Sequence, residues 1–197
     1  APIIIAQPVS STVCSGTNTT FGVTAVGTGL TYYWQVSTDG GSTWNSLSNG
    51  GVYSNVLTAT MSITGATTGM NGYRYRVIVS GTCSPSVTSN AVLLTVNSLP
   101  AITVQPVART ICVGASTTFG VTATGTGLSY QWQVNTDMSR AGWTNLTNVA
   151  PYSNVTTATM SITSATAGMT SYVYRVVVSG TCSPSVTSNN VGLTVNT

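Results

Sequence analysis

Very few side chains in this sequence could carry out chemistry. The chain contains no His, no Lys and no Glu, and its acidic residues are Asp39 and Asp137. General acid–base catalysis normally draws on His, Glu, Asp, Lys, Tyr or Cys held close together. The absence of His excludes Ser–His–Asp and Cys–His sites, and a two-carboxylate glycosidase site would need both acids, one from each repeat described below. We therefore predict that there are no catalytic residues and that the protein is not an enzyme.

The four cysteines are the other groups with chemistry of their own. They are Cys14, Cys83, Cys112 and Cys182. Because they lack the close pairs that zinc sites use, we predict no metal site and no cofactor. Two matching pairs of cysteines indicate disulfides instead, and hence an oxidising, extracellular location.

The charge and the apolar pattern exclude two further classes of partner. Five scattered arginines give a net charge of only +3, which does not make a basic patch, so no nucleic-acid partner is expected. No apolar run approaches the length of a membrane helix, so no membrane insertion is expected.

The chain is organised around a segment that occurs twice. Residues Ser80–Asn90 recur without a change as Ser179–Asn189. In each copy an alternating apolar pattern stands before and after this turn-rich segment, which predicts a β-hairpin with one buried face. Such a repeat predicts two domains, residues 1–97 and 98–197, joined by a short linker that Pro100 stiffens.

The strands that precede the hairpin indicate the fold class. Each copy holds about seven short strands, with a Trp on the third and a Tyr at the start of the sixth. This pattern predicts an all-β protein of two tandem immunoglobulin-like β-sandwich domains. We expect four aromatic side chains in the cores: Trp34, Tyr75, Trp132 and Tyr174. Val23 and Tyr75 stand where antibody domains hold their inter-sheet cysteines, so apolar packing would replace that disulfide.

The segment Ser37-Thr-Asp-Gly-Gly-Ser-Thr-Trp44 predicts a tight hairpin. In it Asp39 accepts backbone N–H groups and a glycine adopts positive φ. The octet also matches the Asp-box pattern of sialidase-type propellers, which is itself a structural turn. The second copy, residues 135–143, is one residue longer and has lost the pattern, which favours a structural role.

The first copy resembles a known family of bacterial domains. The resemblance is carried by Gln7-Pro8, Val13-Cys-Ser-Gly-Thr-Asn-Thr-Thr-Phe21, Gly27-Thr-Gly-Leu-Thr-Tyr-Tyr-Trp34 and the octet above. These runs are similar to the tandem Ig-like domains of large cell-surface adhesin and fibre proteins of Bacteroidota, and the likeness extends over both copies. It implies a secreted structural repeat module of an extracellular filament or adhesin stalk.

Two predictions on partners follow. The linker at residues 96–102 resembles the sequence formed by joining residues 195–197 to residues 1–4. This similarity favours head-to-tail contact with copies of the same chain or with further repeats. The alternative function is a glycan- or surface-binding module, in which exposed Tyr33 or Trp44 would stack on sugar rings.

The expected topology also bears on the disulfides. Cys14 lies at the turn after the first strand and Cys83 in the last hairpin, at opposite ends of a sandwich separated by roughly 25 Å. A disulfide requires Cα atoms within about 7 Å. In a head-to-tail stack Cys14 would face Cys182, which favours a Cys14–Cys182 bond and leaves Cys83 and Cys112 for neighbouring copies. The alternative is local pairing, Cys14–Cys83 and Cys112–Cys182.

Overall fold

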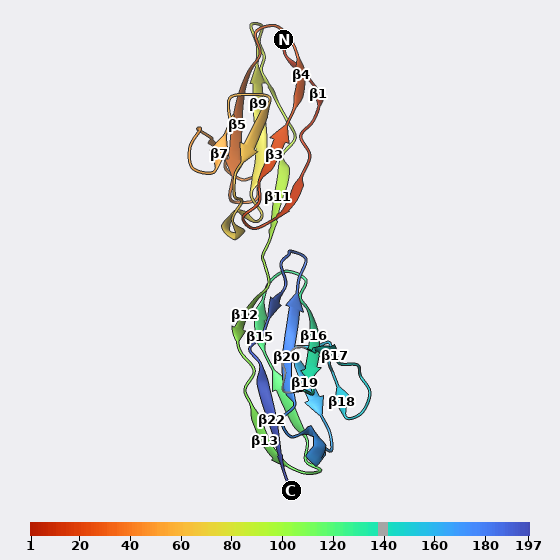
Figure 1. Cartoon of the computed structure of the whole chain (residues 1–197). Helices are drawn as coiled ribbons and strands as arrows, with labels where there is room; N and C mark the ends of the chain where they lie inside the picture. The colour runs from red at the N-terminus through yellow and green to blue at the C-terminus, as the bar shows by residue number, and fades with distance from the viewer. Residues whose placement is uncertain (138–141) are drawn as a thin grey trace. The chain divides into compact units, whose positions relative to one another are not determined.

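The computed structural model describes residues 1–137 and 142–197 of the chain. The described chain is built of β-strands with two short 3-10 helices, and it divides into two compact units, Ala1–Ser98 and Leu99–Thr197 (Figure 1). The predicted all-β class with two tandem sandwiches is confirmed. The boundary lies one residue later than the predicted one.

The elements of the first unit are short and follow the alternating pattern. They are β1 (Ile3–Ala6), β2 (Ser11–Cys14), β3 (Thr19–Gly22), β4 (Thr24–Val26), β5 (Thr31–Ser37), β6 (Asn45–Ser46), β7 (Tyr53–Ser54), β8 (Thr60–Ile63), the 3-10 helix η1 (Thr68–Met70), β9 (Arg74–Ser80), β10 (Val87–Thr88) and β11 (Val92–Asn97).

The second unit repeats this order element by element. It contains β12 (Ala101–Val104), β13 (Arg109–Cys112), β14 (Thr117–Gly120), β15 (Thr122–Thr124), β16 (Ser129–Asn135), β17 (Thr144–Asn145), β18 (Tyr152–Ser153), β19 (Thr159–Ile162), the 3-10 helix η2 (Ala167–Met169), β20 (Val173–Ser179), β21 (Val186–Thr187) and β22 (Val191–Asn196).

Each unit is a sandwich of two layers. In the first unit one layer has the strand order β2-β11-β9-β5-β6, with β10 also paired to β9, and the other consists of β3-β8-β7 and the pair β1-β4. The second unit has the equivalent orders β13-β22-β20-β16-β17, β14-β19-β18 and β12-β15 (Figure 1). A single core cluster in each unit contains residues from both layers, so the two apolar faces are buried against each other.

At the start of each unit the chain takes part in both layers. β1 pairs antiparallel with β4, and after the break at Gln7-Pro8 the chain crosses to the other layer, where β2 pairs in parallel with β11. Proline cannot donate a backbone hydrogen bond, so it suits the point where the chain leaves one sheet. The crossing places Cys14 opposite Asn97, at the end of β2 rather than inside a turn.

Aromatic side chains fill the centre of each core. Trp34 and Tyr75 are fully buried, and the Tyr75 ring stacks on Phe21 with 5.0 Å between ring centroids. The indole Nε1–H of Trp34 donates to the carbonyl oxygen of Thr58 at 2.9 Å. The second unit repeats this arrangement with Trp132, Tyr174, Phe119 and Thr157. The buried indole N–H groups are therefore satisfied. The ring that stacks on each tyrosine belongs to a phenylalanine, Phe21 or Phe119, which lies two residues before Val23 or Val121.

The repeated hairpin returns to β9 in two pieces. Val87 and Thr88 pair with one half of β9, and Val92 and Leu93 pair with the other half. Between the two pieces the buried hydroxyl of Ser89 accepts a hydrogen bond from the Val77 amide at 3.0 Å and donates to the Asn90 carbonyl at 2.9 Å. The side chain thus replaces a backbone partner where the ladder is interrupted, which gives this serine a structural role within the repeated segment.

Candidate functional site

The described residues contain no cluster of three or more His, Cys, Asp or Glu that could hold a metal ion. Asp39 and Asp137 belong to different units. Within the same described ranges, no helix is long and apolar enough to cross a membrane. Candidate sites must therefore be sought in turns, aromatic surfaces, cysteines and pockets.

The turn after β5 is held together by the Asp39 carboxylate. Its Oδ1 accepts from the amides of Ser42 and Thr43 and from the Ser37 hydroxyl, at 3.0, 2.9 and 2.7 Å. Its Oδ2 accepts from the Thr43 hydroxyl at 2.6 Å. These hydrogen bonds, those from Thr43 first, hold the pKa of the Asp39 carboxyl well below its usual range. Asp39 is thus committed to the turn, as the sequence predicted.

Trp44 is also committed to structure. The Arg76 guanidinium lies 4.2 Å from the centre of its ring, and the indole N–H donates to the Gly41 carbonyl at 3.1 Å. Gln35 fixes the arginine, since its side-chain oxygen accepts from Arg76 Nε at 2.8 Å. One face of the Trp44 ring is therefore covered, and its stacking on a sugar through the other face stays a prediction. The other predicted residue, Tyr33, lies on β5 and is 48% exposed.

The second unit repeats the aromatic contact. Arg175 lies 4.0 Å from the centre of the Trp143 ring and donates from Nε to Gln133 at 2.7 Å. The predicted longer hairpin at residues 135–143 falls partly on residues 138–141, which lie outside the described residues. The recurrence of the Arg–Trp–Gln contact in both units indicates that it stabilises the β5–β6 and β16–β17 edges.

The cysteines fall into two classes. Cys14 and Cys182 are disulfide-bonded, whereas Cys83 and Cys112 carry exposed free thiols. Within the first unit, Cys14 and Cys83 lie near opposite ends of β9. Cys14 pairs with Asn97, which lies beyond the Arg74 end of β9, whereas Cys83 follows the Ser80 end. The alternative local pairs, Cys14–Cys83 and Cys112–Cys182, are absent from the structure, because Cys83 and Cys112 are free.

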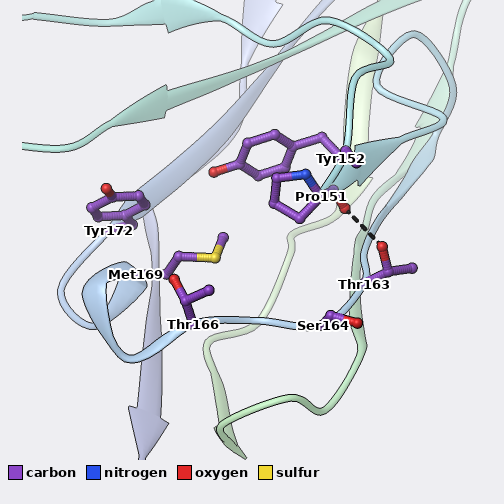
Figure 2. Close-up of a pocket in the computed structure, with 8 residues that line it drawn as sticks. Pro151, Tyr152, Thr163, Ser164, Thr166, Met169 and Tyr172 are labelled. Carbon is purple, nitrogen blue, oxygen red and sulfur yellow. Dashed lines mark hydrogen bonds between the residues drawn. The ribbon is translucent and has the colours of Figure 1, made fainter.

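A pocket of about 520 Å³ lies in the second unit between the start of β18, the end of β19 and η2. Figure 2 shows the rings of Tyr152 and Tyr172 on its walls, with the Met169 side chain between them. Pro151 completes the apolar wall, and its carbonyl oxygen accepts from the Thr163 amide at 2.9 Å and from the Thr163 hydroxyl at 3.3 Å. Burial raises the pKa of the Tyr152 phenol, and its hydroxyl shares a hydrogen bond of 3.3 Å with the hydroxyl of the buried Tyr174.

A second pocket, of about 530 Å³, adjoins the first at Thr163. Its walls are hydroxyl-bearing residues of β14 and β19, including Thr118 and Ser161, and the guanidinium of Arg109 from β13. Arg109 Nε donates to the Thr118 carbonyl at 3.1 Å, which ties the side chain to the neighbouring layer. Neither pocket had been predicted from the sequence. Their residues come from separate segments of the sequence, 109–118, 150–152 and 161–172, and no single segment has a pattern that predicts a pocket.

Comparison with known proteins supports the fold and says little about the site. Residues 5–98 match the family described as "Domain of unknown function (DUF8696)". No curated protein is similar to the chain at a significant level.

Many solved structures share the fold. An I-band fragment from titin is 17% identical, has a TM-score of 0.74, and aligns over 98% of this chain and 65% of its own length. The Ig domains 1–4 of Sidekick-1 are 18% identical, with a TM-score of 0.71 over 100% of this chain and 49% of that one. The D1–D2 fragment of Rst is 16% identical, with a TM-score of 0.68 and 99% of both chains covered. The chain spans less than two thirds of the length of the titin fragment. The three alignments show that it has the architecture of tandem immunoglobulin domains.

Proposed function

We propose that this chain is a non-enzymatic structural repeat module of an extracellular bacterial fibre or adhesin stalk. The observation that carries the proposal is the duplication of one complete sandwich, with equivalent strand orders and equivalent aromatic cores in both units. Repeated domains with few charges and no catalytic constellation suit an extended load-bearing element better than a reaction site. The similarity to Bacteroidota surface domains supports the bacterial, cell-surface setting.

The proposed partners are copies of the same chain, stacked head to tail. The cysteines support this arrangement, because Cys83 and Cys112 carry exposed free thiols that an oxidising environment would join between chains. For Cys14 and Cys182, each of which is disulfide-bonded, we propose the Cys14–Cys182 bond that the sequence analysis favours. The low net charge of +3 leaves little long-range repulsion between copies.

Oxidation of the purified chain tests the proposal. Under mild oxidant we expect a ladder of covalent multimers on non-reducing gels and filaments in electron micrographs, both dispersed by reductant. The variant Cys83→Ser/Cys112→Ser is the matched control and should remain monomeric, with its fold unchanged, because both side chains are exposed. A natively isolated chain that stays monomeric at every concentration and redox state would refute head-to-tail assembly.

Glycan binding is a second candidate function, favoured by one observation. The aromatic pocket of the second unit is open and rimmed by hydroxyl groups, whereas Trp44 is covered by Arg76. In this function Tyr152 and Tyr172 join the predicted residues Tyr33 and Trp44 as the aromatic side chains that would contact a sugar.

A further inference from the structure

The two pockets of the second unit differ in their chemistry and share one lining residue, Thr163. They meet at Thr163, and each has a volume within the range of about 300–1,000 Å³ that is usual for small-ligand sites. The first pocket, lined by Pro151, Tyr152, Met169 and Tyr172, is the aromatic subsite. The second, which holds Arg109, is the cationic subsite.

The aromatic subsite has the chemistry that recognises a sugar ring. Tyrosine rings provide flat apolar faces for the C–H groups of a pyranose, and their hydroxyls lie at the edge of that face. Hydroxyl groups of Thr163, Ser164 and Thr166 line the same pocket and can exchange hydrogen bonds with sugar hydroxyls. No ionisable group other than tyrosine is among the lining residues, so this subsite suits a neutral part of a ligand.

The cationic subsite favours a ligand that carries a negative charge. Arg109 uses Nε to hold the Thr118 carbonyl, and that bond leaves the two terminal nitrogens of its guanidinium for a ligand. None of the residues that line this pocket is acidic, so the positive charge is not compensated within it. Arginine binds carboxylates in a bidentate manner, which adds both strength and geometric selectivity.

We propose that the second unit binds an acidic oligosaccharide, with a sugar ring against Tyr152 and Tyr172 and a sugar carboxylate on Arg109. The inference rests on glycan binding, the second candidate function above, and is independent of the stalk role. A chain of sugars fits because the two subsites share Thr163. One of them suits a neutral sugar ring and the other a carboxylate.

The first unit provides an internal comparison. Arg109 pairs with Leu193 on the last strand of the second unit, and Ser11 pairs with the equivalent Leu94 in the first unit. Ser11 therefore stands at the position of Arg109. Val52 occupies the position of Pro151, because its carbonyl accepts from Thr64 as that of Pro151 accepts from Thr163. Arg109 and Pro151 are thus replaced in a unit with the same fold, whereas Tyr53, Tyr73 and Met70 keep the residue types of Tyr152, Tyr172 and Met169. We expect the cationic subsite, and with it the preference for an acidic ligand, to be confined to the second unit.

These natural replacements supply variants that the fold tolerates. We would titrate the whole chain with trigalacturonic acid and, separately, with the neutral trisaccharide maltotriose, and follow backbone amide shifts by NMR. Trigalacturonic acid should shift the amides of residues 161–172 and 109–118, and its affinity should fall with rising salt. Arg109→Ser should weaken it by about tenfold, which corresponds to one charge-assisted contact. Pro151→Val should weaken both trisaccharides.

The matched control is Arg74→Ser, which removes the same charge from the first unit. It should leave both affinities unchanged, and an effect equal to that of Arg109→Ser would overturn the site as non-specific charge attraction. Equal binding of the two trisaccharides, insensitive to Arg109→Ser, would overturn the acidic subsite but keep glycan binding at the aromatic one. Absence of binding for both at millimolar concentrations would overturn the inference and the second candidate function together, while leaving the stalk proposal untouched.

Discussion

Replacement of Trp34 by Ala should remove most of the stability of the first unit. The side chain is fully buried, and its indole N–H satisfies the Thr58 carbonyl at 2.9 Å. Truncation of a buried Trp to Ala costs about 3–5 kcal/mol, since apolar contacts are lost and a cavity remains. The carbonyl left without a donor adds about 1 kcal/mol. The sum is close to the lower end of the total stability of a small domain, about 5 kcal/mol.

Urea unfolding, followed by circular dichroism in the presence of reductant, measures this loss. Because the chain contains two compact units, the variant should separate one early transition from an unchanged later one. Trp44→Ala is the matched control in the same unit. This ring is half-buried, and it loses the Arg76 contact and one hydrogen bond to the Gly41 carbonyl, so its removal should cost only about 1–2 kcal/mol.

A loss of less than about 1 kcal/mol for Trp34→Ala would refute the reasoning, because no buried indole at the centre of a core can be removed so cheaply. A cost for Trp44→Ala as large as that for Trp34→Ala would equally contradict the distinction drawn between the core and the edge of the sheet.

Two further predictions concern single groups. The pKa of Asp39 lies below the ordinary value of about 3.9, so its contribution to stability is present above that pH and is lost as the pH falls through the lowered pKa. The stability of the first unit should therefore fall less steeply with decreasing pH in Asp39→Asn than in the parent chain, as measured by thermal unfolding between about pH 5 and about pH 2. Parallel stability curves for the two proteins would count against this. Non-reducing peptide mapping should recover a peptide that joins Cys14 to Cys182, and a peptide joining Cys14 to Cys83 would establish the local pairing instead.

The fold could be predicted because its signals are local. Alternating apolar residues specify strands, and the strand that runs from Arg74 to Ser80 has alternate residues buried along its whole length. The crossing of the first strand between layers could not be read in this way. It depends on the parallel partner of β2, which is β11, some 80 residues later in the sequence, where Ser11 lies opposite Leu94. Only the break at Gln7-Pro8 gave a local sign of it.

The candidate site was less predictable for the same reason. Trp44 reads as an exposed aromatic in its own segment, and only the pairing of β5 with β9 brings Arg76 onto its ring. Tyr152 and Tyr172 read as ordinary strand residues, and only the packing of η2 beside β18 opens a pocket between them. A binding surface built from segments far apart in sequence has no local pattern of its own.

The repeat nevertheless separates the residues that maintain the fold from those free to acquire a function. The two units share their buried aromatic residues and the serine that bridges the interrupted hairpin, Ser89 in one and Ser188 in the other. They differ at the pocket rim, where Ser11 is replaced by Arg109. A change in a packed core costs several kcal/mol, whereas a surface change away from special contacts usually costs less than about 0.5 kcal/mol. Duplicated units can therefore diverge at such rims without loss of the fold, which is where a difference in binding between them is expected.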